Sequence, residues 1–146
     1  MKYLVKTIAT ALAIAAATST ALAEKQTPGP KGGKLLENEA PRAEFFVEPD
    51  HNVTITFYDE NLKPVPAKDQ AVTATAEAEG SKTKLEFEKK GDLLVSKAPL
   101  PHGEGYNIVV QLKQTPEAKT QNFRIKYDTH ICGGCKLPEY ACTCDE

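Results

Sequence analysis

The residues best suited to chemistry are four cysteines within the last 15 residues of the 146-residue chain: Cys132, Cys135, Cys142 and Cys144. Two glycines separate the first pair, and they let the backbone turn tightly enough for both thiolates to face one ion. After six intervening residues, a Cys-x-Cys pair offers two more sulfurs. Four thiolates suit tetrahedral Zn²⁺, iron or soft Cu(I). The spacing therefore predicts a zinc or copper site made by these cysteines, in which His130 could replace one sulfur.

Disulfide bonding is the alternative for an even number of cysteines in an exported chain. A bond between Cys142 and Cys144 would close a strained ring, so two crossed bridges between the pairs are the form to expect. Their loops are too short to add much stability. A dithiol oxidoreductase is the third alternative. The sequence favours it less, because the Cys-x-x-Cys pair follows a predicted strand and does not lie at the N-terminus of a helix.

The rest of the chain offers no active-site pattern. It has no Gly-x-Ser-x-Gly, no phosphate-cradling loop and no His-Glu-x-x-His, which predicts a protein that is not an enzyme. His51 and His102 lie in predicted loops and are expected to be solvated. The Asn52-Val53-Thr54 triplet matches a glycosylation acceptor, but it enters a predicted strand and is interpreted as a chance match.

The first 23 residues have the pattern of a secretory signal peptide. Lys2 and Lys6 precede an apolar run over residues 8–17, and Ala21-Leu22-Ala23 forms a small-x-small cleavage site. Without those two lysines the mature chain would carry 16 basic and 20 acidic residues, a net charge of −4. Nucleic-acid binding calls for a basic footprint and is not expected. No second long apolar run follows, so a periplasmic or secreted protein without a membrane span is predicted.

The elements that must position the cysteines are strands. A flexible leader is expected over residues 24–34, an immunoglobulin-like β-sandwich over 35–128 and a cysteine-rich tail over 129–146. Alternating apolar residues predict strands at 43–48, 52–59, 71–78, 83–88, 93–97, 105–113 and 121–128, with a short edge at 34–37. Tyr106, after a Gly-rich loop, is placed to form a tyrosine corner.

Two short segments carry a resemblance to exported metal-handling proteins. Lys31-Gly32-Gly33-Lys34-Leu35-Leu36-Glu37-Asn38, leading to Ala43-Glu44-Phe45-Phe46-Val47, resembles the segment that opens the N-terminal region of periplasmic adaptors in heavy-metal efflux pumps. The Gly103-Glu104-Gly105-Tyr106 strand entry is similar to that of copper-resistance periplasmic binding proteins. The whole chain resembles uncharacterised exported bacterial β-sandwich proteins with a cysteine-rich C-terminus. Met1 is the chain's one methionine, so the copper proteins' Met ligands have no counterpart here.

Two functions follow as expectations. The first is a metal-binding protein whose site is structural, buffers metal or hands it over, with a metal ion as its ligand. The second is a disulfide-stapled module of the cell envelope that recognises a protein partner along its strand edges. Exposure separates the two kinds of metal site: a structural site would pack against the sandwich edge, whereas an exchanging site would reach solvent.

Overall fold

The computed structural model describes residues 26–36 and 39–144, and nearly all of its regular structure is strand. The predicted signal peptide, residues 1–23, lies outside the described residues. The elements are β1 (Lys34–Leu35), β2 (Arg42–Val47), β3 (Val53–Tyr58), β4 (Pro64–Val65), β5 (Ala71–Ala78), β6 (Ser81–Lys90), β7 (Leu93–Ser96), β8 (Asn107–Lys113), β9 (Gln121–Lys126) and the short 3-10 helix η1 (Glu139–Ala141). In the described part of the chain, no helix has the length and apolar character needed to span a membrane.

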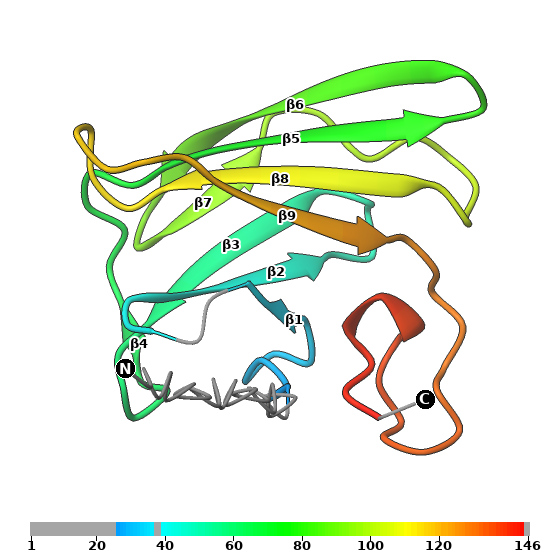
Figure 1. Cartoon of the computed structure of the whole chain (residues 1–146), viewed down its shortest axis with the longest axis horizontal. Coiled ribbons are helices and arrows are strands. Elements are labelled where there is room, and N and C mark those ends of the chain that lie inside the picture. The colour runs from blue at the N-terminus through cyan, green and yellow to red at the C-terminus, as the bar shows by residue number, and fades with distance from the viewer. Residues whose placement is uncertain (1–25, 37–38, 145–146) are drawn as a thin grey trace, which may run out of the picture.

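One curled antiparallel sheet supplies both layers of the sandwich (Figure 1). Its strands run in the order β1-β2-β3-β7-β6-β5-β8-β9, and β4 pairs with β3 outside this path. The long strand β6 joins the layers, because residues 81–86 pair with β5 and residues 87–90 pair with β7. The predicted all-β sandwich is confirmed.

The strands lie where alternation of apolar residues predicted them, and each of the seven predicted runs overlaps one. In β8 the inward residues Ile108, Val110 and Leu112 are fully buried, as a period of two requires. The predicted edge at 34–37 is present as β1. None of the predicted strands covers β4, in which Pro64 and Val65 pair with the end of β3. Proline is tolerated there because β4 is a short edge strand.

The predicted tyrosine corner is present at the entry to β8. The Tyr106 hydroxyl donates a hydrogen bond to the Pro101 carbonyl at 2.8 Å. The loop is tied to the end of β9 as well, because Gly105 N–H donates to the Tyr127 carbonyl at 2.7 Å and Tyr127 N–H donates to the Tyr106 carbonyl at 2.8 Å. These bonds hold the β7–β8 loop beside the segment that leads into the cysteine tail.

A fully buried carboxylate, that of Glu44, fixes the segment before β1. It accepts hydrogen bonds from Lys31 N–H at 3.0 Å, from Gly33 N–H at 2.8 Å and from the Tyr58 hydroxyl at 2.6 Å. Burial and the bond to Glu44 raise the pKa of Tyr58, which therefore stays a donor. A Cβ at Gly29 would collide with the Glu44 side chain. The flexible leader expected over residues 24–34 is therefore an ordered turn in its second half.

We predict that Glu44→Gln destabilises the sandwich, because the loss of the buried charge weakens the bonds that Glu44 accepts from Lys31 N–H, Gly33 N–H and the Tyr58 hydroxyl. The expected loss is about 2 kcal/mol in the free energy of unfolding, the scale of hydrogen bonds to a buried charge. The shift in denaturant midpoint at unchanged slope measures it. Glu86→Gln is the matched control, since that side chain is 60% exposed, and it should change stability by less than about 0.5 kcal/mol. Equal effects of the two variants would contradict the prediction.

Candidate metal centre

Tyr140 attaches the cysteine tail to the core of the sandwich. The residue is 4% exposed, and its ring packs edge-on against Phe45, at 6.3 Å between ring centroids, and beside Tyr127 at 6.0 Å. Its hydroxyl accepts a hydrogen bond from Val47 N–H at 3.2 Å. The tail residues next to Tyr140 therefore have a fixed position relative to β2 and to the end of β9.

Backbone hydrogen bonds fold the first cysteine pair into a tight turn. Cys132 N–H donates to the Leu137 carbonyl at 2.8 Å, and Lys136 N–H donates back to the Cys132 carbonyl at 3.1 Å. Lys136 adopts a left-handed backbone with φ of +63°, and its ammonium reaches the Gly133 carbonyl at 2.8 Å. The Cys-Gly-Gly-Cys sequence thus turns both of its side chains toward η1 and the second pair.

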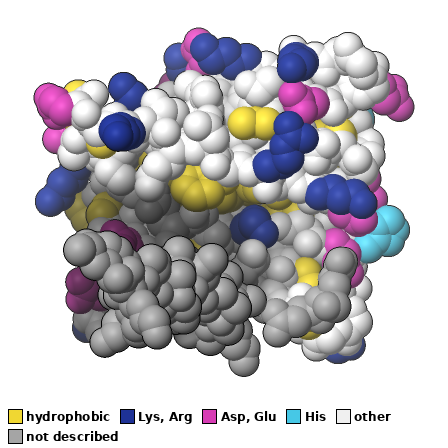
Figure 2. All heavy atoms as spheres, viewed as in Figure 1, with side chains coloured by type: hydrophobic (Ala, Val, Ile, Leu, Met, Phe, Trp, Pro, Cys, Tyr) yellow, Lys and Arg dark blue, Asp and Glu magenta, His cyan; other side chains and the backbone are white. Residues whose placement is uncertain are grey.

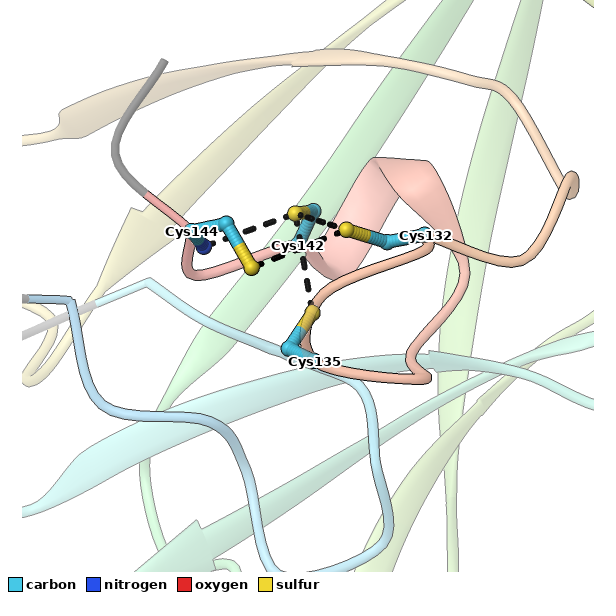
Figure 3. A group of neighbouring side chains, drawn as sticks. All are labelled: Cys132, Cys135, Cys142 and Cys144. Atoms are coloured by element: carbon cyan, nitrogen blue, oxygen red, sulfur yellow. Dashed lines mark hydrogen bonds between the residues drawn. The ribbon is translucent and has the colours of Figure 1, made fainter.

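The four sulfurs converge on one point (Figure 3). All lie within 4.8 Å of one another. The Cys132–Cys144 and Cys135–Cys142 Sγ–Sγ distances are 3.7 and 3.6 Å, and Cys132 and Cys142 approach to 2.9 Å. A zinc–sulfur bond of about 2.3 Å gives a tetrahedral sulfur–sulfur edge of about 3.8 Å. Two of the observed distances already match that edge, and the third needs to open by less than about 1 Å.

Glycine at position 134 is required by the approach of Cys144. A Cβ built on Gly134 would lie 2.6 Å from Cys144 Sγ, whereas a Cβ on Gly133 would have no neighbour within 4 Å. The two glycines have the same predicted role in the turn, but they differ in the space around them. Gly134 leaves room for the fourth sulfur, and Gly133 lies in open space.

Backbone N–H groups favour thiolates in the first pair. The N–H groups of Thr143 and Leu137 lower the pKa of Cys135 to about 6. Donation by the Cys142 thiol, followed by the N–H groups of Cys135 and Gly134, lowers the pKa of Cys132. As the donor, Cys142 keeps its proton, and its pKa rises to about 12. Metal binding would displace that shared proton.

Exposure increases along the cluster. Cys132 is buried, Cys135 and Cys142 are half-buried, and Cys144 is exposed. The cluster thus combines a feature of a structural site with one of an exchanging site: its scaffold packs on the sandwich through η1, and one of its cysteines is exposed.

The histidines lie apart from the sulfurs. His130, a candidate ligand by sequence, instead has its Nδ1 2.7 Å from Asp128 Oδ1 and 3.4 Å from Glu104 Oε2. Its neighbouring carboxylate Asp128 raises the pKa of His130. His51 and His102 are exposed, as predicted, and their ring centroids lie 5.7 Å apart. In the described part of the chain, the sulfur group thus contains the four cysteines and no histidine.

Sequence reasoning missed two residues on which this geometry depends. Tyr140 lies between the cysteine pairs, and an aromatic residue beside Ala141 in this short tail was a signal for docking. Gly134 was noted for turning, but its contact with Cys144 had no sequence signal.

No family model, no curated protein and no solved structure matches this chain. The cysteine cluster therefore has to be interpreted from its own geometry and chemistry.

We predict that Tyr140→Ala releases the tail and leaves the sandwich folded. Removal of a buried aromatic side chain costs about 3 kcal/mol or more. Here that cost reduces the free energy with which the tail docks on the sandwich. Amide hydrogen exchange at Cys132 and Glu139 should then accelerate about a hundredfold, while the β8 amides keep their protection. Ile131→Ala is the control, because Ile131 is 63% exposed in the same tail. Unchanged exchange in Tyr140→Ala would show that the tail is held by other contacts.

Proposed function

We propose that this chain is an exported, non-enzymatic metal-binding protein whose tail holds one zinc ion through the thiolates of Cys132, Cys135, Cys142 and Cys144. The observation that supports it best is the convergence of four sulfurs from two short segments, at spacings close to a tetrahedral edge. The donor set is soft and tetrahedral, which suits zinc first and Cu(I) second.

The electrostatics of the cluster favour a bound cation. Four thiolates around Zn²⁺ leave a net charge of −2, which the surroundings must stabilise. The N–H groups that lower the pKa values of Cys132 and Cys135 supply part of that stabilisation. Lys34, which is half-buried and close enough to Cys142 to interact with its charge, supplies another part.

Handover or buffering fits the site better than a purely structural role. The sandwich folds around its own buried core, and the tail docks through Tyr140 rather than through the sulfurs. Cys144 at the surface offers a position where an incoming ligand could replace a thiolate. The resemblance to periplasmic metal-handling proteins and the predicted export signal agree with such a role.

A disulfide-stapled envelope module is the second candidate. The 2.9 Å approach of Cys132 and Cys142 favours it, because two thiols that close can join to a bond of about 2.05 Å after a small movement. Cys135 would then pair with Cys144.

Intact mass of protein purified from the periplasm without added metal separates the two functions. We expect one zinc in the native spectrum, lost on denaturation to leave four free thiols, and loss of the metal in Cys142→Ser. Thr143→Ala is the control, since its side chain is not a ligand, and it should keep the zinc. A denatured mass lower by four hydrogens, with nothing bound beforehand, would overturn the metal proposal and favour the stapled module.

We predict that Gly134→Ala weakens zinc binding at least about tenfold, the consequence of about 1.4 kcal/mol lost when the new Cβ displaces Cys144. Gly133→Ala adds the same methyl group to the same turn, in open space, and should bind zinc like the wild type. Competition with a chromogenic chelator measures both constants. Equal affinities for the two variants would mean that Cys144 is not a ligand.

A further inference from the structure

The three histidines of the chain gather at one end of the sandwich. His51 lies between β2 and β3, His102 between β7 and β8, and His130 after β9. The end of β2, the start of β8 and the end of β9 point to the same side of Figure 1. Figure 2 shows histidine and acidic side chains together on that side of the surface. Ligand-type side chains from three distant segments therefore meet there.

One of these histidines belongs to a set of three metal-ligating groups. His130 Nδ1, Asp128 Oδ1 and a Glu104 carboxylate oxygen lie within 4.8 Å of one another, and none of them belongs to the sulfur group. Metal bonds of about 2.0–2.2 Å to nitrogen and oxygen give ligand–ligand edges of about 3.4 Å. The His130–Glu104 distance of 3.4 Å equals that edge, and the His130–Asp128 distance of 2.7 Å is shorter by less than about 1 Å.

The backbone that carries these groups is fixed by bonds outside the set. Gly103 and Gly105, with φ of +96° and +81°, shape the loop around Glu104. Gly105 is bonded to the Tyr127 carbonyl, immediately before Asp128. The His130 carbonyl accepts from Glu139 N–H at 2.8 Å, which ties it to the docked tail. Bonds outside the set thus hold the loop around Glu104, the start of the Asp128 segment and the His130 carbonyl, and the bond from His130 N–H to Asp128 Oδ1 at 3.0 Å completes the turn.

We propose that Glu104, Asp128 and His130 form a second metal site, which takes a divalent first-row cation such as Zn²⁺ through one imidazole and two carboxylates. Three protein ligands leave a position open for water or for a ligand from another molecule. The His130 side chain is 79% exposed, so this site exchanges its ion with solvent more readily than the thiolate cluster does. The inference is independent of the proposed function, because the two donor sets share no residue.

Zinc titration of the metal-free full chain under reducing conditions tests this site, with ions counted by native mass spectrometry. We expect two zinc ions in the wild type and one in His130→Gln, whose second dissociation constant should rise at least tenfold. His51→Gln is the matched control, an exposed loop histidine outside the set, and it should keep both ions. Cys142→Ser should lose the thiolate ion and keep the other.

Imidazole nitrogen NMR identifies the ligand directly. Zinc should shift the Nδ1 resonance of His130 and leave those of His51 and His102 in place. The site is overturned if His130→Gln binds both ions with wild-type affinity, or if saturating zinc leaves the His130 ring unshifted, in which case the three side chains form an ion pair only. A single zinc that shifts His130 and is unaffected by Cys142→Ser would sustain this site and reject the thiolate centre.

Discussion

The packing of Tyr140 against Phe45 and Tyr127 is the contact on which the rest of the tail depends. A tail of 18 residues with four small thiols cannot bury enough surface to fold alone. The aromatic contact fixes the tail to the sandwich, and the Tyr140 hydroxyl accepts a hydrogen bond from Val47 N–H of β2. Once η1 is docked, Cys142 has a defined position, and the Cys-Gly-Gly-Cys turn can close over it.

Because the tail docks through Tyr140, the stability of the fold does not depend on whether the cysteines bind a metal or form disulfides. Small metal domains often unfold without their ion, because ligation supplies the free energy of folding. In this chain the core of Ile55, Phe57, Leu85 and Ile108 is complete without the sulfurs. The fold therefore does not depend on ligation at the cysteines. Under the proposed function, the cluster would therefore keep its shape when the ion leaves, as metal exchange requires.

The sequence was informative wherever a local pattern decides the structure. Alternation located the strands, and Gly-Glu-Gly-Tyr located the tyrosine corner at Tyr106. The cysteine spacing predicted the cluster, because two short turns place four sulfurs together whatever lies behind them. The sequence did not reveal the role of Glu44. Its position in the alternating pattern of the strand predicts an exposed side chain, whereas its carboxylate binds a turn more than ten residues away. Pairing of β4 with β3 was missed for the same reason, since long-range hydrogen bonds leave no local periodicity.

His130 shows why nearness in sequence does not establish coordination. It is two residues from Cys132, yet Asp128 accepts from both its N–H, at 3.0 Å, and its ring. That turn directs the imidazole toward the β7–β8 loop, while its carbonyl is bonded to Glu139. To reach the sulfurs, the His130 ring would have to leave both the Asp128 and the Glu104 carboxylates. Nitrogen and oxygen donors are therefore kept apart from the thiolates.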